Sequence, residues 1–277
     1  MGVLAALGSA VCYGVADFTG GLLSRRAYFV VVAFAGQAGG LLLALVTAPL
    51  LATGVPGAAD LAWGAASGVG TAMGMIFLYR GMSRGAMSVV VPVSAVTGVA
   101  LPVLVGVLLL GDRPQPLSWC GLAAAVPALW LVSRTGGSEH EGPSTAASSD
   151  GLIAGCGIAL QYLALAQAEG GVWPVAAGRF AAVVALLPWA ASARRRPPTA
   201  PRDMAGAVVT GMTAALALIL YAQAVQQQLT VIAVALSSFY PAIPVLLGIV
   251  LLREQVRRIQ VTGLATAGAA IALLAMG

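Results

Sequence analysis

The sequence predicts an all-α membrane protein with about ten transmembrane helices, arranged as two inverted five-helix repeats. The first observation is composition. Of the 277 residues, 60% are apolar and 8% are charged, and the mean hydropathy is +0.95, whereas a soluble chain carries about 25% charged residues. The second observation is a succession of long apolar runs, and the third is an internal repeat. Because so few charged residues cannot cover a water-facing surface, we expect lipid to surround most of the exterior of the protein.

Ten apolar runs have the length that a membrane-spanning helix needs, about 20 residues. They cover residues 2–23, 28–52, 60–80, 85–110, 117–133, 151–169, 173–193, 203–225, 230–252 and 257–276. Short breaks rich in arginine, glycine and proline separate them. The first run has no basic leading segment and is followed at once by another apolar run, which favours a membrane span over a cleaved signal peptide.

The longest polar stretch lies near the middle of the chain. Residues 134–150 are rich in Gly, Ser, Glu, Pro and Thr, a composition typical of a flexible linker. The stretch predicts three parts: a first repeat over residues 1–133, the linker, and a second repeat over residues 151–277.

The two outer parts repeat each other at an offset of 142 residues. Pro102–Gly106 aligns with Pro244–Gly248, and Gly121–Ala123 aligns with Gly263–Ala265. Because five helices per copy is an odd number, the second copy must enter the membrane from the opposite side. Such inverted repeats, related by a pseudo-two-fold axis in the membrane plane, are typical of transporters whose halves rock about a shared central site.

The same segments carry a family resemblance. Pro102–Gly121 ends one helix with Gly-Asp-Arg and opens the next with an apolar run, Tyr240–Gly263 is its counterpart, and Tyr13–Gly21 forms part of the first helix. These features resemble the drug/metabolite transporter superfamily, in particular its two-domain EamA type, over nearly the whole chain. The resemblance implies ten helices, a central cavity and the transport of small metabolites such as amino acids, but no particular substrate.

Arginines gather on one side of the predicted membrane. The loops after the first, third, fifth, seventh and ninth helices hold Arg25, Arg26, Arg80, Arg84, Arg134, Arg194, Arg195, Arg196, Arg202, Arg253, Arg257 and Arg258. The opposite loops hold only Arg113. The positive-inside rule then places both termini outside, whereas the family resemblance implies cytoplasmic termini. Such loops suit the anionic headgroups of a plasma membrane, and no nucleic-acid module is visible.

Asp17 is the most informative charge because a charge inside a span is costly, roughly 2.5–3.5 kcal/mol on insertion scales. One interpretation is that Asp17 lines the cavity and binds a cationic group or carries a coupling proton. One alternative is a buried structural pair with Arg179 in the seventh helix, and another is an interfacial Asp that serves local helix geometry. Arg179 is equivalent to Gln37 in the first repeat, so this position is expected to face protein. For Arg179, bonding of backbone carbonyls freed near the prolines is favoured slightly over substrate contact.

The fourth and ninth helices combine prolines with polar residues. Proline frees a backbone carbonyl, which in lipid must be satisfied by protein or cavity water, so paired prolines at similar depth indicate a central site; kinking for packing is the alternative. These helices contribute the cavity candidates Ser94, Thr97, Ser237, Ser238 and Tyr240, beside Pro92, Pro102, Pro241 and Pro244.

Two tyrosines are related by the repeat. Tyr79 and Tyr221 either gate the cavity or belong to an aromatic belt at the membrane interface, and the belt is slightly favoured. Further cavity candidates are Tyr13, Trp63, Gln161 and Gln223.

The sequence contains few residues that would support another functional class, such as an enzyme or a metal-binding protein. A single histidine, His140, and three dispersed cysteines make a metal site or a Ser/His/Asp triad improbable, and no phosphate-binding loop is visible. We therefore expect no enzyme and no cofactor. The expected function is secondary transport of a small polar or amphipathic metabolite, amino-acid-like or amine-containing, by a monomer or weak homodimer, with proton coupling through Asp17 as one option. An uncoupled facilitator or exchanger and a non-transporting structural subunit are the alternatives.

Overall fold

The structure is a computed structural model, which describes residues 2–51, 56–106, 108, 115–133, 145–168, 171–193, 196, 198–227, 240–254, 256 and 258–276. Over these residues the chain is helical and contains no strand. The helices are α1 (Gly2–Ser24), α2 (Phe29–Leu51), α3 (Ala58–Arg84), α4 (Met87–Val105), α5 (Pro116–Ser133), α6 (Thr145–Leu165), α7 (Val172–Ala193), α8 (Pro201–Gln227), α10 (Ala242–Leu251) and α11 (Arg258–Met276). The predicted all-α class is confirmed.

Six of the described helices are long and apolar enough to cross a membrane: α1, α2, α3, α4, α7 and most of α8. The apolar stretches of α5, α10 and α11 are shorter. The helix α6 is not among the six because its first turns, from Thr145 to Asp150, are polar. The structure therefore supports a multi-pass membrane protein, in which several of the ten expected runs fall short of a full apolar span within the described residues.

The beginning of α6 differs from expectation. The helix starts at Thr145 rather than at residue 151, so it includes the last six residues of the predicted linker. The physical reason is that Asp150 is buried, at 2% exposure, and pairs with Arg80 and Arg84 of α3. With its charge matched, this polar turn packs against protein instead of extending into water.

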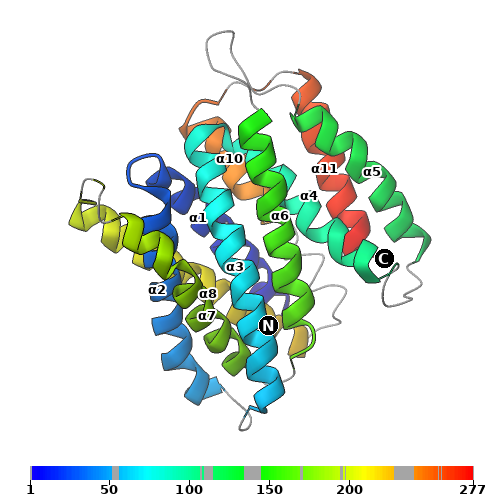
Figure 1. Cartoon of the computed structure of the whole chain (residues 1–277). Coiled ribbons are helices and arrows are strands. Elements are labelled where there is room, and N and C mark those ends of the chain that lie inside the picture. Colours follow the sequence, from blue (N-terminus) through cyan, green and yellow to red (C-terminus); the bar gives the residue numbers. More distant parts are fainter. Residues whose placement is uncertain are drawn as a thin grey trace.

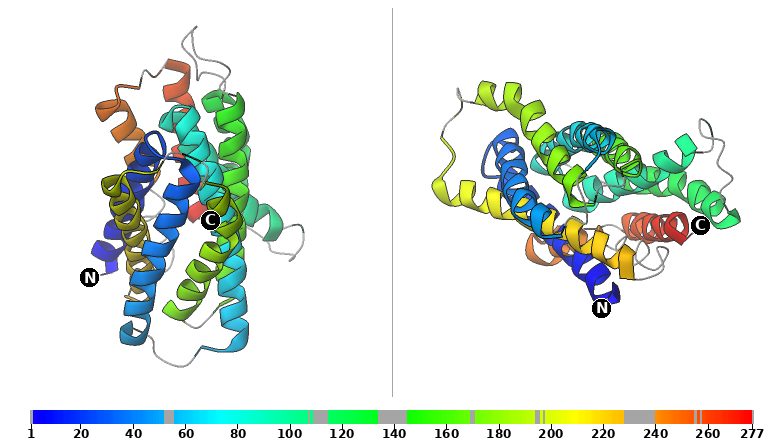
Figure 2. Two further views of the ribbon diagram at one scale, coloured as in Figure 1. Left: turned by 60° about the vertical axis from the view of Figure 1, so that its left-hand side comes forward. Right: turned by 90° about the horizontal axis from the view of Figure 1, so that it is seen from below.

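Helices from the two ends of the chain interleave in space. Helix α1 packs against α8, α2 against α7 and α8, and α6 against α3 and α4. Helices α5 and α11 lie side by side at one edge of the bundle (Figures 1 and 2). The largest cluster of buried apolar side chains joins several of these helices and includes Phe18, Leu78, Met82, Met87 and Leu186.

Close glycine contacts determine where the helices cross near the centre. A Cβ atom on Gly211 of α8 would lie 2.6 Å from Gly36 Cα of α2, and one on Gly178 of α7 would lie 2.8 Å from the Gly64 carbonyl of α3. Small residues permit such backbone approach in membrane proteins. The two crossings are adjacent to Gln37 and Arg179 and bring these side chains together.

Candidate functional site

A small buried polar chamber lies where α1, α2, α3, α6, α7 and α8 meet. Its volume is about 40 Å³, and besides Tyr13 its polar lining consists of six buried residues: Asp17, Gln37, Thr71, Tyr79, Gln161 and Arg179. We call this space the polar chamber. All six side chains are at most 9% exposed, so they face one another inside an otherwise apolar bundle.

The carboxylate of Asp17 has no hydrogen bond or ion pair within the described residues. The alternative of a structural Asp17–Arg179 pair is therefore not realised in this structure. Arg179 instead donates from Nη1 to Oε1 of Gln37 over 2.8 Å, so the expected bonds to carbonyls freed by proline are not its contacts. The polar chamber thus contains one negative and one positive side chain that do not neutralise each other directly.

The pair of Gln37 and Arg179 occupies a special position. The two residues are separated by 142 positions in the sequence, the same offset that aligns the repeats. The bond therefore joins two residues that the sequence offset predicts to be equivalent, one on α2 and one on α7. Both residues line the polar chamber.

A larger cavity adjoins the polar chamber. It has a volume of about 290 Å³ and carries the side chains of four tyrosines, Tyr13, Tyr162, Tyr221 and Tyr240. We call it the tyrosine cavity. The rings of Tyr13 and Tyr240 lie 5.7 Å apart at an angle of 49°, and Tyr13 lines both spaces. The buried hydroxyl of Tyr13 has no hydrogen-bond partner in the described structure, which leaves a polar group at the junction.

Several predicted residues do lie in these two spaces. Asp17, Tyr79, Gln161 and Arg179 line the polar chamber, Tyr221 and Tyr240 line the tyrosine cavity, and Tyr13 lines both. Tyr79 is only 5% exposed, so the favoured interpretation of Tyr79 as part of an interfacial aromatic belt is not supported by its position. Tyr162 also lines the tyrosine cavity but is not among the residues predicted from the sequence, although a tyrosine directly after Gln161 in an apolar run is a usable signal.

The other candidates lie elsewhere. Trp63 is 45% exposed on α3 and lines none of the cavities described here. Ser94 and Thr97 are buried, but each hydroxyl donates to a carbonyl of its own helix, at Val91 and Val93. This back-bonding, which is common for hydroxyl side chains inside helices, occupies their donors.

The remaining sequence candidates bring less to the site. Gln223 is half-buried and lines none of the described cavities. Ser237 and Ser238 lie outside the described residues. Two of the prolines predicted to mark a central site, Pro102 and Pro241, do line the tyrosine cavity. Pro241 directly precedes α10, a position where proline removes no helical hydrogen bond.

Charged residues close one end of the bundle, at the ends of α1, α3 and α10 and the beginnings of α4 and α6. We call this end, with Arg25, Arg80, Arg84, Asp150 and Glu254, the arginine face. Arg80 donates from Nε to Asp150 Oδ1 over 3.0 Å and again from Nη2. Arg25 donates from Nη2 to Glu254 Oε1 over 3.1 Å. Both contacts join a residue of the first half to a residue of the second.

Glu254 also caps a helix. Its two carboxylate oxygens accept the backbone N–H groups of Met87, at 2.9 Å, and Ser88, at 3.0 Å. These groups belong to the first turn of α4, which has no partners for them within the helix. A carboxylate at this position also interacts favourably with the helix dipole. The loop after α10 is thereby tied to the start of α4.

The tyrosine cavity, the polar chamber and the arginine face follow one another along α1 and the residue directly after it. Ser9 and Tyr13 line the tyrosine cavity, Asp17 lines the polar chamber, and Arg25 belongs to the arginine face. At 1.5 Å per residue, Asp17 lies about 12 Å and Ser9 about 24 Å from Arg25 along the helix axis. The tyrosine cavity, where Tyr162 is 37% exposed, therefore lies on the side of the polar chamber away from the arginine face.

The fold and this site define a class: multi-pass membrane proteins with an internal cavity between two sets of helices. Residues 151–276 match the EamA-like transporter family. Over these residues the chain is similar to a transporter family of the drug/metabolite type, which supports the resemblance seen in its sequence. Proteins of this family are membrane transporters and in general not enzymes.

A solved structure supports the fold over the whole chain. This crystal structure of a protein superimposes with a TM-score of 0.60 at 18% sequence identity. The alignment covers 98% of this chain and 96% of that chain, and it shows a shared fold alone. None of the curated proteins matches the chain.

Proposed function

We propose that the chain is a secondary transporter that moves a small amphipathic, amine-containing metabolite by alternating access. The observation that carries this proposal is the unpaired carboxylate of Asp17, buried in the polar chamber next to the tyrosine cavity. A charge buried without a partner is costly, and a substrate ammonium group or a proton would compensate it. Arg179, which lines the same chamber, suits a carboxylate, and this favours amino-acid-like solutes.

The volumes of the polar chamber and the tyrosine cavity favour different roles for the two spaces in binding a substrate. The polar chamber, at about 40 Å³, accommodates a charged headgroup of a few atoms but no whole metabolite. The tyrosine cavity, at about 290 Å³, is large enough for the apolar part, and its tyrosine rings attract both apolar groups and cations. An amphipathic solute would place its polar end on Asp17 and its apolar end among the tyrosines.

The packing supports two inverted, related halves. If α1 to α5 correspond in order to α6, α7, α8, α10 and α11, the contact between α3 and α6 corresponds to that between α8 and α1. The contact between α3 and α7 likewise corresponds to that between α8 and α2. The α2–α7 and α5–α11 contacts each join two equivalent helices, so each contact is its own counterpart. The central Gln37–Arg179 bond agrees with this exchange. Two such halves can rock about the polar chamber.

In the alternating-access cycle that we propose, the structure corresponds to a state in which the path from the polar chamber is closed at the arginine face. The Arg25–Glu254 and Arg80–Asp150 pairs hold the halves together there, while the tyrosine cavity lies on the other side of the polar chamber. Opening towards the arginine face would require both pairs to part. By the positive-inside rule, that face is cytoplasmic in the plasma membrane and both termini are outside. The cavity is built within one chain, so a monomer or a weak homodimer suffices for transport.

Solute counterflow in proteoliposomes tests the proposal. The panel should contain amino acids, simple amines and neutral analogues of each, and we expect counterflow of at least one amine-containing solute. Asp17→Asn should abolish this flux, whereas Asp203→Asn, which removes an acid from the first turn of α8, should leave it unchanged. A pH gradient that drives accumulation would establish proton coupling, while exchange without accumulation would favour a facilitator. Absence of flux for the whole panel, with folded protein, would instead favour a structural subunit.

A further inference from the structure

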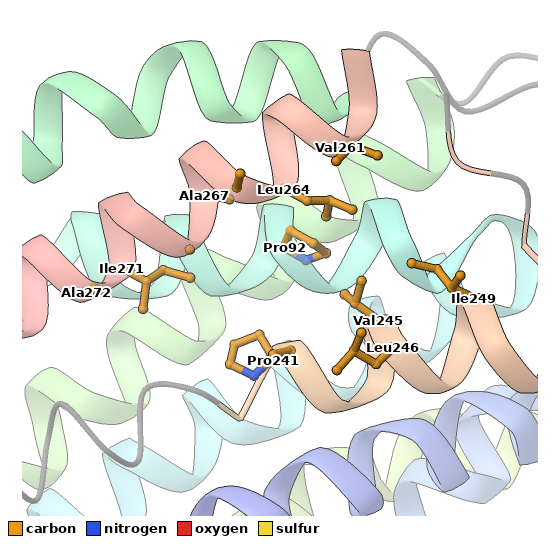
Figure 3. A pocket seen from close by; sticks show the side chains of 13 residues that line it. Pro92, Pro241, Val245, Leu246, Ile249, Val261, Leu264, Ala267, Ile271 and Ala272 are labelled. Atoms are coloured by element: carbon orange, nitrogen blue, oxygen red, sulfur yellow. The ribbon is translucent and has the colours of Figure 1, made fainter. Parts of the chain in front are cut away.

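A third cavity, larger than the polar chamber and the tyrosine cavity, lies on the outside of the bundle between α4, α10 and α11 (Figure 3). It has a volume of about 370 Å³ and is lined only by aliphatic side chains, proline and glycine, among them Pro92, Val245, Leu264 and Ile271. We call it the aliphatic groove. With no polar side chain in its lining, it offers nothing to orient a polar metabolite.

The aliphatic groove faces the surroundings of the protein. Two of its lining residues, Leu246 of α10 and Val261 of α11, are 58% and 55% exposed. In a membrane protein, such a surface contacts lipid tails rather than water. Gly268 also lines the groove, and a Cβ atom added there would meet no atom within 4 Å. The groove therefore has room for an inserted chain.

The length of the groove matches one leaflet of a bilayer. It extends along α11 from Val261, near the arginine face, to Ile271. Ten residues of helix rise about 15 Å, and the hydrocarbon core of a bilayer is about 30 Å thick. The groove thus reaches from the headgroup level on the arginine face to about the middle of the membrane, as an acyl chain of that leaflet does.

Two arginines stand at the headgroup end. Arg253 lies just beyond the end of α10 at Leu251, four residues after Ile249, the last groove residue of that helix. Arg258 is the first residue of α11 and precedes Val261 by three residues, about one helical turn. Both side chains are exposed, and neither forms an ion pair within the described part of the chain. Glu254, between them in sequence, is already bonded to Arg25 and to α4. The positive charge of the two arginines is therefore available to an anion.

We propose that the aliphatic groove binds one acyl chain of an anionic phospholipid, whose phosphate contacts Arg253 and Arg258. An apolar slot of one leaflet's depth selects a lipid tail, and the two exposed arginines select an anionic headgroup, because guanidinium groups bind phosphate well. The groove shares Pro241 and Ile271 with the tyrosine cavity. A lipid seated here would thus contact the wall of the proposed transport path, although the binding itself does not depend on transport.

Native mass spectrometry of the full-length protein tests this site, with phosphatidylglycerol and phosphatidylcholine of identical acyl chains as probes. We expect phosphatidylglycerol to be retained about ten-fold better. The double variant R253Q/R258Q should reduce its retention to that of phosphatidylcholine. Gly268→Leu, which places a side chain into the open space of the groove, should reduce the binding of both lipids. Thermal unfolding midpoints close to that of the wild type would show that these variants are folded.

The control is Arg202→Gln, which removes an exposed arginine at the start of α8, outside the groove lining. If this change weakens phosphatidylglycerol binding as much as the double variant, general surface charge and not the groove binds the lipid. Equal retention of the two lipids, or unchanged binding in Gly268→Leu, would also overturn the proposal. So would a protein dimer that Gly268→Leu converts to monomer with lipid binding intact, because a second copy would then be the occupant.

Discussion

Replacing Glu254 with glutamine should loosen the arginine face. In the wild type, one carboxylate oxygen accepts the Met87 N–H and a guanidinium N–H of Arg25, and the other accepts the Ser88 N–H. Glutamine has the same shape but only one acceptor oxygen. Its amide group would direct an N–H towards one of the two backbone N–H groups of α4, so at least one of them loses its partner.

The magnitude follows from burial. The side chain of Glu254 is 10% exposed, and a hydrogen bond to a charged group contributes about 1.5–3 kcal/mol. Arg25 is 30% exposed, so its ion pair adds little, at most about 1 kcal/mol; it also keeps its bonds to the carbonyls of Met82 and Gly85. We therefore expect a loss of about 2 kcal/mol at the start of α4, which corresponds to about a thirty-fold change in an opening equilibrium.

Amide hydrogen exchange measures this opening directly. In Glu254→Gln, peptides that contain Met87 and Ser88 should exchange about thirty-fold faster, while those from the middle of α7 should be unchanged. Asp203→Asn is the matched control, because Asp203 lies at the start of α8 and forms no described bond to α4. Equal protection of the first turn of α4 in the wild type and Glu254→Gln would refute the capping role of Glu254.

Three further predictions concern stability, each measured as thermal unfolding in detergent. Asp150→Asn replaces the buried negative charge beside the half-buried Arg80 with a neutral amide that keeps one acceptor oxygen. It should cost about 2 kcal/mol, less than the loss of a fully buried pair because of partial exposure; an unchanged midpoint would contradict this. Gly211→Ala puts a methyl group into the backbone of α2 and should cost about 3 kcal/mol or prevent folding, whereas wild-type stability would show that the crossing is looser than described. Gln37→Leu leaves Arg179 without its acceptor and should cost about 3 kcal/mol, while Gln37→Glu, which retains an acceptor, should be tolerated better.

The sequence predicts much of the architecture because membrane helices follow simple rules. Apolar length and arginine-rich breaks locate the helices, and the repeat pairs Gln37 with Arg179 and predicts that both face protein. The buried position of Asp17 follows from the cost of exposing its charge to lipid. These predictions rest on local composition or on the repeat, which are properties of the sequence itself.

Contacts between distant segments could not be predicted in the same way. The polar side chain of Asp150 suits a linker, and only the contact with Arg80 accounts for its burial in a helix. Glu254 is far in sequence from the start of α4 that it caps. Tyr79 would suit a membrane interface equally well if α1 were not packed against α3. In each case the deciding partner is a side chain or helix that only the three-dimensional arrangement supplies.

The bond between Gln37 and Arg179 has a consequence for how the two halves can be related. In a complex of two identical chains, residues facing each other across a two-fold axis are the same. Two arginines there would both be donors and would repel, because a guanidinium group has no acceptor. An arginine that donates to a glutamine at this point requires the halves to differ. In the arrangement of two inverted halves that we propose, covalent fusion of the repeats thus permits a central contact that a symmetric homodimer of either half could not form.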